Sequence, residues 1–397
     1  MSVVTGIGTT FGLPNYHGEL IALSPTETPL LSVAGGVTGG GSVTDTIIEW
    51  QGSDLRGPSI RTRLEGADAP TAEERVRQNF TNRVQIFQEQ VATSYTKQAA
   101  IGRYANLAQG APNPVTDEHS WQVMQALLQI AKDLNYTMWN GIRNDPADNT
   151  TARQMAGLLS VITSNAQAKH VTTVGASAAT DTITATHALA LNDKVVFTDV
   201  GVATTINKDR TYWVTAIPVA TASFKVSLTK GGAPIVIGTA TVSFIEMAAA
   251  NILVKDDVDA LLQSVYDNNG ISNQGTATIF CGSGIRRALT KAYLTASTAI
   301  SVFNGTRNVG GLSLETILTD FGTLNISIER MLPADALVVV STEQIQPVFL
   351  AVPNKGVLFE EELAKTGSAD KTQIYGEIGM KYGNQASHGI LRGIYTV

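Results

Sequence analysis

The feature that most constrains this chain is a strongly polar stretch between two segments with strand character, residues 44–51 and 83–95. Both segments place apolar residues among polar ones in the alternation typical of strands. The stretch between them is charged, and its few apolar residues include Leu55, Ile60, Leu64 and Val76. Such a segment cannot bury enough apolar surface to order itself. A loop of this length inside a compact domain is functional, disordered or held by a partner.

Two interpretations of this stretch remain open from the residues alone. It is a solvated flexible loop, or it is a long β-hairpin whose charges pair across an interface between subunits. Charges of both signs argue against nucleic-acid binding, which needs an excess of basic residues. In the hairpin interpretation the contact residues are Arg56, Arg61, Arg63, Glu65, Asp68, Glu73, Arg75 and Arg77.

The N-terminal residues 1–43 also lack the pattern of a packed element. Prolines and a glycine-rich run at 35–41 interrupt helices and strand ladders alike. Apolar residues are nevertheless scattered through the segment, and a disordered tail usually carries fewer. The segment is either a mobile terminus or an extended arm that docks on something, such as another subunit. The candidate docking residues are Phe11, Leu13, Leu20 and Leu30.

Residues 116–141 carry the clearest helical signal. Thr116 can cap the helix, and Asp117 and Glu118 suit its first turn. Apolar residues then recur with a period near 3.6, and Gly141 is a plausible stop. The apolar positions are Trp121, Met124, Leu127, Leu128, Ala131, Leu134, Met138 and Trp139. A helix of this length, roughly 38 Å at 1.5 Å per residue, is expected to brace a whole domain.

Residues 166–249 differ from the flanking segments in their pattern of apolar and polar residues. Helical periodicity is lost, and short β-like runs alternate with turn residues such as Asn192-Asp193. The pattern predicts a small antiparallel sandwich or barrel inserted into another domain. The expected strands are 181–186, 194–198, 212–217, 223–229, 235–237 and 241–244.

The rest of the chain alternates short helices and strands, so the fold class is α+β. Helical spacing resumes at Leu253, and a second helix is expected at 284–294. The expected strands are 278–281, 324–329, 336–340, 357–361, 373–381 and 389–395.

Composition and motifs exclude several function classes. The chain has 397 residues, a net charge of −6 and one cysteine, which excludes a disulfide framework and a cysteine-built metal site. No run approaches the ~18 apolar residues of a membrane span, and no signal peptide is expected at the N-terminus. None of the five histidines has metal-ligand spacing from another, and no phosphate-binding loop occurs. We therefore expect no catalytic residues, no cofactor and no metal.

The two ends of the chain resemble a known family. Thr-Phe-Gly-Leu-Pro-Asn-Tyr-x-Gly-Glu-Leu at 10–20 is similar to the opening of a group of phage major head proteins. Residues 375–383, followed by His388-Gly389 and Arg392-Gly393, are similar to the end of the same proteins. The chain thus resembles a tailed-phage major capsid protein with the HK97-type fold. The β-rich segment at 166–249 departs from the plain family pattern.

The resemblance implies a division of the chain. An N-terminal arm would take residues 1–43 and an extended loop residues 44–98. A peripheral domain would take 99–156 and 351–397, with the helix at 116–141 as its spine. An axial domain would take 157–165 and 250–350, with the β-domain 166–249 inserted into it.

The resemblance also implies a function without catalysis. Copies of the chain would assemble as hexamers and pentamers into an icosahedral head shell around double-stranded DNA. Other partners would be the portal, scaffolding or decoration proteins, and weakly contacted DNA, with no membrane. Assembly would take place in the host bacterial cytoplasm and the product would be the virion. The alternative is a nanocompartment shell of the same fold, similar to encapsulins.

Overall fold

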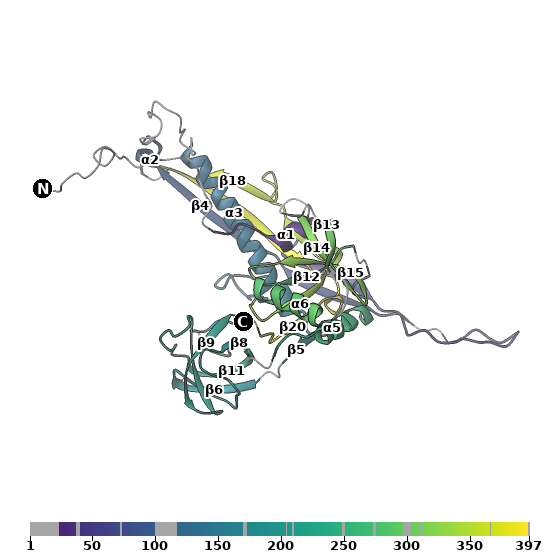
Figure 1. The fold of residues 1–397 in the computed structure, drawn as a ribbon. Helices are drawn as coiled ribbons and strands as arrows, with labels where there is room; N and C mark the ends of the chain where they lie inside the picture. The colour runs from purple at the N-terminus through teal and green to yellow at the C-terminus, as the bar shows by residue number, and fades with distance from the viewer. Residues whose placement is uncertain are drawn as a thin grey trace, which may run out of the picture. The chain divides into compact units, whose positions relative to one another are not determined.

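The computed structural model describes residues 24–36, 40–71, 74–99, 117–169, 173–203, 205–208, 210–247, 251–272, 275–296, 303–309, 312–365 and 367–395. The chain divides into two compact units. The first unit comprises Met1–Glu27, Phe87–Lys132 and Leu358–Gly376. The second comprises Thr28–Ile86, Asp133–Val357 and Glu377–Val397. Figure 1 labels many of the elements of both units.

The first unit contains a small sheet and the start of the long helix. Strand β18 (Leu358–Glu362) pairs antiparallel with the first part of β19 (Ala369–Lys381), from Leu358 opposite Gly376 to Glu362 opposite Thr372. Strand β4 (Gln85–Ser94) also pairs with β19, and the short helix α2 (Tyr95–Ala99) follows it.

The predicted long helix is confirmed as α3 (Glu118–Asn140), which runs from the first unit into the second. The Asp117 carboxylate accepts a hydrogen bond from the His119 N–H at 3.0 Å and so caps the first turn. The predicted cap, Thr116, lies outside the described residues. The apolar face is buried unevenly. Leu134, Met138 and Trp139 are fully buried, whereas Met124, Leu127 and Leu128 are 40–61% exposed.

The second unit is built around a mixed sheet of seven strands in the order β13-β14-β15-β12-β16-β20-β5. Helices α5 (Lys255–Asp267) and α6 (Ser283–Ala296) contribute Val258, Leu261, Ile285 and Leu289 to the core of this sheet. The strands are β5 (Ala166–Ala168), β12 (Ala277–Cys281), β13 (Phe303–Val309), β14 (Leu312–Thr319), β15 (Gly322–Ile328), β16 (Leu337–Ser341) and β20 (Gly389–Arg392).

Strand β20 differs from its expected place. The sequence analysis assigned 351–397 as a whole to the peripheral domain, together with 99–156. In the structure β20 pairs antiparallel with β16, which was expected to be axial, and parallel with β5, which was expected to belong to the inserted β-domain 166–249. A buried ion pair holds it there, because Arg392 Nε donates to Asp335 Oδ2 at 2.9 Å. The end of the chain was assigned from the family resemblance, whereas strand pairing depends on long-range contacts within this chain.

Residues within 173–247 form a closed six-stranded barrel in the order β10-β7-β6-β11-β8-β9, drawn in teal in Figure 1. Its core holds Phe197, Tyr212, Phe224 and Phe244, whose rings pack edge to face. The strands are β6 (Thr173–Thr180), β7 (Thr182–Thr184), β8 (Lys194–Asp199), β9 (Thr211–Val219), β10 (Ser223–Ser227) and β11 (Gly238–Met247). The sequence analysis missed β6, and residues 235–237 are not a strand.

The predicted strand at 83–95 is confirmed as β4 (Gln85–Ser94), but the strand before it, β3 (Arg77–Arg83), was not predicted. Strand β2 (Ile47–Ser53) pairs with β3 (Arg77–Arg83), from Ile47 opposite Arg83 to Ser53 opposite Arg77. Strand β3 ends at Arg83, and β4 begins at Gln85 after the single residue Val84. The sequence of β3 is Arg-Gln-Asn-Phe-Thr-Asn-Arg, which is too polar to predict a strand. These residues form a strand because they pair with β2.

The remaining elements of the second unit are short. Strand β1 (Gly41–Val43) pairs parallel with β17 (Gln346–Leu350), and β17 pairs antiparallel with the last part of β19. The others are the helices α1 (Pro29–Val33) and α4 (Leu158–Val161) and the 3-10 helices η1 (Thr342–Gln344) and η2 (Gln385–Ser387).

Candidate assembly surface

The loop between β2 and β3, residues 54–76, is exposed at every described position. We call it the hairpin. Its tip is a turn in which the Ala67 N–H donates to the Leu64 carbonyl at 3.2 Å. Gly66, the third residue of this turn, has a φ of +78°. A type II turn requires a positive φ at that position, and glycine adopts it readily. The paired strands β2 and β3 and this turn form a β-hairpin, and the pairing of its charges with another subunit stays a prediction.

The hairpin exposes apolar as well as charged side chains. Leu55 is 80% exposed, Ile60 95%, Leu64 85% and Val76 78%. Four large apolar side chains of the hairpin are thus almost fully open to water.

The predicted contact residues fall largely on this hairpin. Arg56, Arg61, Arg63, Glu65, Asp68 and Arg75 are exposed, and Arg77 opens β3, where it donates to Gln51 Oε1 at 3.2 Å. Glu73 lies outside the described residues, as do Phe11, Leu13 and Leu20 of the arm. Whether these residues contact another subunit stays a prediction.

Leu30, the fourth docking candidate, is fully buried within its own chain. It lies in α1, where the Leu31 N–H donates to Asn135 Oδ1 of α3 at 3.1 Å. Asn135 Nδ2 in turn donates to the buried Glu329 at 3.2 Å, as does the Trp139 indole at 3.0 Å. These bonds tie α1 to the helix and the seven-stranded sheet, so Leu30 has no surface left for a neighbouring subunit.

The root of the hairpin is anchored by buried side chains that sequence reasoning did not single out. Asn82 of β3 is fully buried. Its Nδ2 donates to the Met380 carbonyl at 2.7 Å and the Ala156 carbonyl at 3.3 Å, and its Oδ1 accepts from the Ala156 N–H at 2.9 Å. One amide therefore joins three distant segments. The only signal in the sequence is an asparagine inside a strand, where asparagine is uncommon.

Trp50 of β2 anchors the other strand. Its indole N–H donates to the Gly383 carbonyl at 2.9 Å. Its ring is stacked with that of Phe80, with 6.2 Å between the ring centroids. It also packs edge to face with the ring of Tyr382, with 4.7 Å between the centroids. These contacts tie β2, the strand that leads into the hairpin, to residues 382–383 of the same unit.

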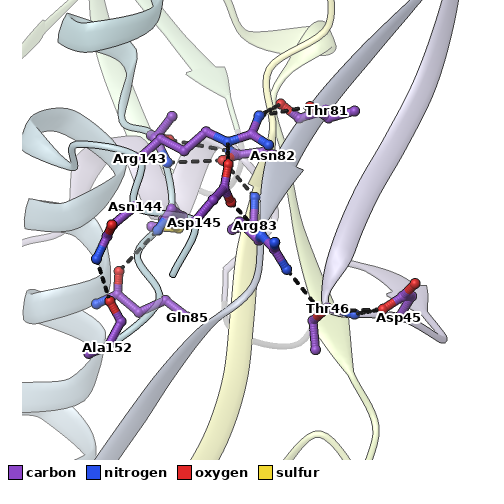
Figure 2. Close-up of polar contacts among 12 residues, drawn as sticks. Asp45, Thr46, Thr81, Asn82, Arg83, Gln85, Arg143, Asn144, Asp145 and Ala152 are labelled. Carbon is purple, nitrogen blue, oxygen red and sulfur yellow. Dashed lines mark hydrogen bonds and ion pairs between the residues drawn. The ribbon is translucent and has the colours of Figure 1, made fainter. Parts of the chain in front are cut away.

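An ion-pair cluster closes the root, as Figure 2 shows. The Asp145 carboxylate accepts from Arg83 Nε and, at 2.6 Å, from Arg143 Nε. Arg143 also donates to the Thr81 carbonyl at 2.9 Å. Partial burial alone would raise the pKa of Asp145, but the hydrogen bonds and charges of the two arginines outweigh it and lower that pKa. The Asp145 carboxylate is therefore ionised at neutral pH.

The described residues offer little for chemistry. No group of three His, Cys, Asp or Glu side chains in them could hold a metal ion. No described helix is long and apolar enough to cross a membrane. What the described residues do provide is an exposed hairpin whose strands are tied to the second unit by buried hydrogen bonds.

Comparison with solved structures identifies the fold. The capsid asymmetric unit of cyanophage A-1(L) is 12% identical, with 98% of this chain and 99% of that chain covered and a TM-score of 0.50. The capsid of cyanophage P-SCSP1u is 10% identical, with coverages of 98% and 95% and a TM-score of 0.49. The holo-SrpI encapsulin complex of Synechococcus elongatus PCC 7942 is 8% identical, with coverages of 100% and 99% and a TM-score of 0.49. The cyanophage A-1(L) match confirms the expected α+β, HK97-like capsid fold.

The family of the chain is shown by a match of its sequence to a family model. The model of the SU10 major capsid protein family matches residues 3–395, and the chain belongs to that family. No curated protein matches the chain. The chain is thus a phage major capsid protein, a structural protein that associates with itself to form the shell of the virion. The family match also favours the phage capsid over the nanocompartment alternative.

Proposed function

We propose that copies of this chain form hexamers and pentamers of a closed icosahedral head around the double-stranded DNA of a tailed phage, and that each hairpin lies on a neighbouring copy. The observation that carries the role of the hairpin is its exposure, with Leu55, Ile60 and Leu64 at least 80% exposed above a tightly bonded root. A subunit that stayed alone in water would have no use for this surface.

Magnitudes favour apolar burial over charge as the source of contact energy. Burying one large aliphatic side chain contributes about 1.5–3 kcal/mol. An exposed ion pair contributes about 0–1 kcal/mol. The charges of the hairpin therefore serve mainly to select the partner surface, and repetition over many copies makes the shell cooperative.

The proposal keeps the other assignments of the sequence analysis. The arm, extended loop, peripheral and axial domains and inserted β-domain are the working division of the chain, except that β5 and β20 join the axial sheet. The portal and scaffolding or decoration proteins are further partners, and assembly takes place in the host bacterial cytoplasm. A net charge of −6 suits a wall that contacts DNA only weakly, because tight phosphate binding would hinder packaging and release.

The experiment replaces Leu55, Ile60 and Leu64 together by serine, which keeps the length of the hairpin. We expect a folded protein with an unchanged circular dichroism spectrum that no longer forms particles in negative-stain micrographs. The matched control replaces Val202 and Val236, which are 79% and 60% exposed on the barrel, by serine. The control should assemble normally. Normal particles from the triple variant would remove the hairpin from the shell contacts.

Native particles also decide between the two kinds of shell. Extraction of double-stranded DNA of genome length supports the phage head. Particles that contain a protein cargo and no nucleic acid would instead support the nanocompartment.

A further inference from the structure

The charges of the hairpin are segregated along the chain. Residues 55–64, which we call the basic limb, contain Arg56, Arg61 and Arg63 and no acidic residue. Residues 65–74, the acidic limb, contain Glu65, Asp68, Glu73 and Glu74 and no basic residue. The exposed Leu55, Ile60 and Leu64 all lie on the basic limb. The basic limb therefore has the composition of a contact strip for an acidic surface with apolar patches.

The last six residues of the basic limb, 59–64, have a two-residue period. Ile60, Thr62 and Leu64 alternate with Ser59, Arg61 and Arg63. In an extended conformation the apolar set lies on one face and the two arginines on the other. Pro58, which lacks an N–H, lies just before this segment, and each of residues 59–64 has an N–H that can donate to a strand ladder.

Strand β18 has the complementary pattern at an open edge. It is the last strand in the order β1-β17-β19-β18, and among the described residues its strand partner is β19. Glu360 and Glu362 are exposed and share one face. Phe359 and Glu361 share the other, where the Phe359 ring lies 5.6 Å from that of Tyr375. A strand edge of this kind is a template for another extended segment.

We propose that residues 59–64 of one copy add as a strand to the edge of β18 in a neighbouring copy. This inference rests on the proposed function, because it names the surface on which the hairpin lies. When Thr62 lies opposite Glu361, Arg61 and Arg63 face Glu360 and Glu362. In the same register Ile60 and Leu64 fall on the face of Phe359 and Tyr375. The match holds for a parallel or an antiparallel strand.

The two-residue period makes this match specific. A slip by one residue would place both arginines on the aromatic face and Ile60 and Leu64 among the glutamates. Contacts of the arginines within the hairpin do not prevent the pairing, because a guanidinium has five donors and can serve two acceptors. Backbone hydrogen bonds supply the attraction, and the alternating side chains select the register.

Charge exchange tests the pairing. We expect Arg61→Glu with Arg63→Glu, and separately Glu360→Arg with Glu362→Arg, each to lower the particle yield by about tenfold or more, because like charges then face each other. The variant with all four changes restores opposite charges and should return most of the yield. A four-fold variant that assembles no better than the two-fold variants overturns the pairing.

A cysteine pair tests the register directly. Thr62→Cys with Glu361→Cys places two thiols opposite each other in either strand direction, within the range that a disulfide spans after small adjustment. The native Cys281 is buried and its pKa is raised to about 12, so it does not compete for oxidation. Mild oxidation of assembled particles should give a ladder of linked chains on a denaturing gel. The matched control, Thr62→Cys with Asp267→Cys, uses an exposed acidic position on α5 and should give none.

The outcomes separate this inference from the proposed function. Particles that form without a ladder, or with links only inside single chains, overturn the strand addition and leave the role of the hairpin intact. Normal assembly of the triple serine variant described above would overturn both.

Discussion

Replacing Asn82 by alanine should loosen the root of the hairpin while leaving its tip chemically unchanged. The side chain of Asn82 satisfies the Ala156 N–H and the Met380 carbonyl, both in buried surroundings. Alanine leaves these two backbone groups without their partner, and each unsatisfied buried group costs about 1–3 kcal/mol. The expected loss is therefore about 2–6 kcal/mol of local stability.

Hydrogen exchange measures this loss where it occurs. The amides of β2 and β3 should exchange about 30-fold faster or more, since ~1.4 kcal/mol corresponds to a factor of ten. Asn79→Ala is the matched control, because Asn79 lies on the same strand and is exposed. Its exchange should equal that of the wild type. Exchange in Asn82→Ala within about threefold of this control would refute the anchoring role of Asn82.

Three further predictions concern the second unit. The Asp145 pKa is lowered in the folded protein, so its ion pairs stabilise fully above the ordinary value of 3.8 and are lost as the pH falls through the depressed value. The stability difference between wild type and Asp145→Asn in urea titrations should thus be constant from about pH 7 to 5 and shrink below about pH 4; a pH-independent difference would contradict it. Arg392→Ala leaves Asp335 buried without its partner and should cost about 3–5 kcal/mol in urea unfolding, whereas Arg287→Ala, on the exposed side of α6, should cost little. Deleting 168–248 should leave assembly intact, because the barrel has its own core; complete loss of particles in electron micrographs would argue against an inserted domain.

Local patterns predicted several elements well, and long-range pairing explains where they did not. The α3 helix followed from apolar spacing and acidic first-turn residues. Its exposed Met124, Leu127 and Leu128 did not follow, because spacing defines a face but not how much of that face the chain itself covers. Strand β3 was missed because its polar sequence acquires strand geometry only through β2.

The assembly surface shows the same division. The hairpin and its charged residues were apparent from composition, since a polar stretch between two strands has no core to join. Asn82, Arg143 and Asp145 were not apparent, because their roles depend on carbonyls and charges up to hundreds of positions away. Residues of that kind carry no local pattern.

The amino-acid sequence by itself determined the α+β class, the long helix, the β-rich segment and the polar hairpin, because each depends on the order of neighbouring side chains. It also carried the end motifs that the family match extends over residues 3–395. Only the tertiary structure decided that Leu30 is buried in its own chain, that β20 joins the seven-stranded sheet, and that Asn82 anchors the hairpin. Burial and hydrogen bonding between distant segments arise when the whole chain is folded, so no window of sequence contains them.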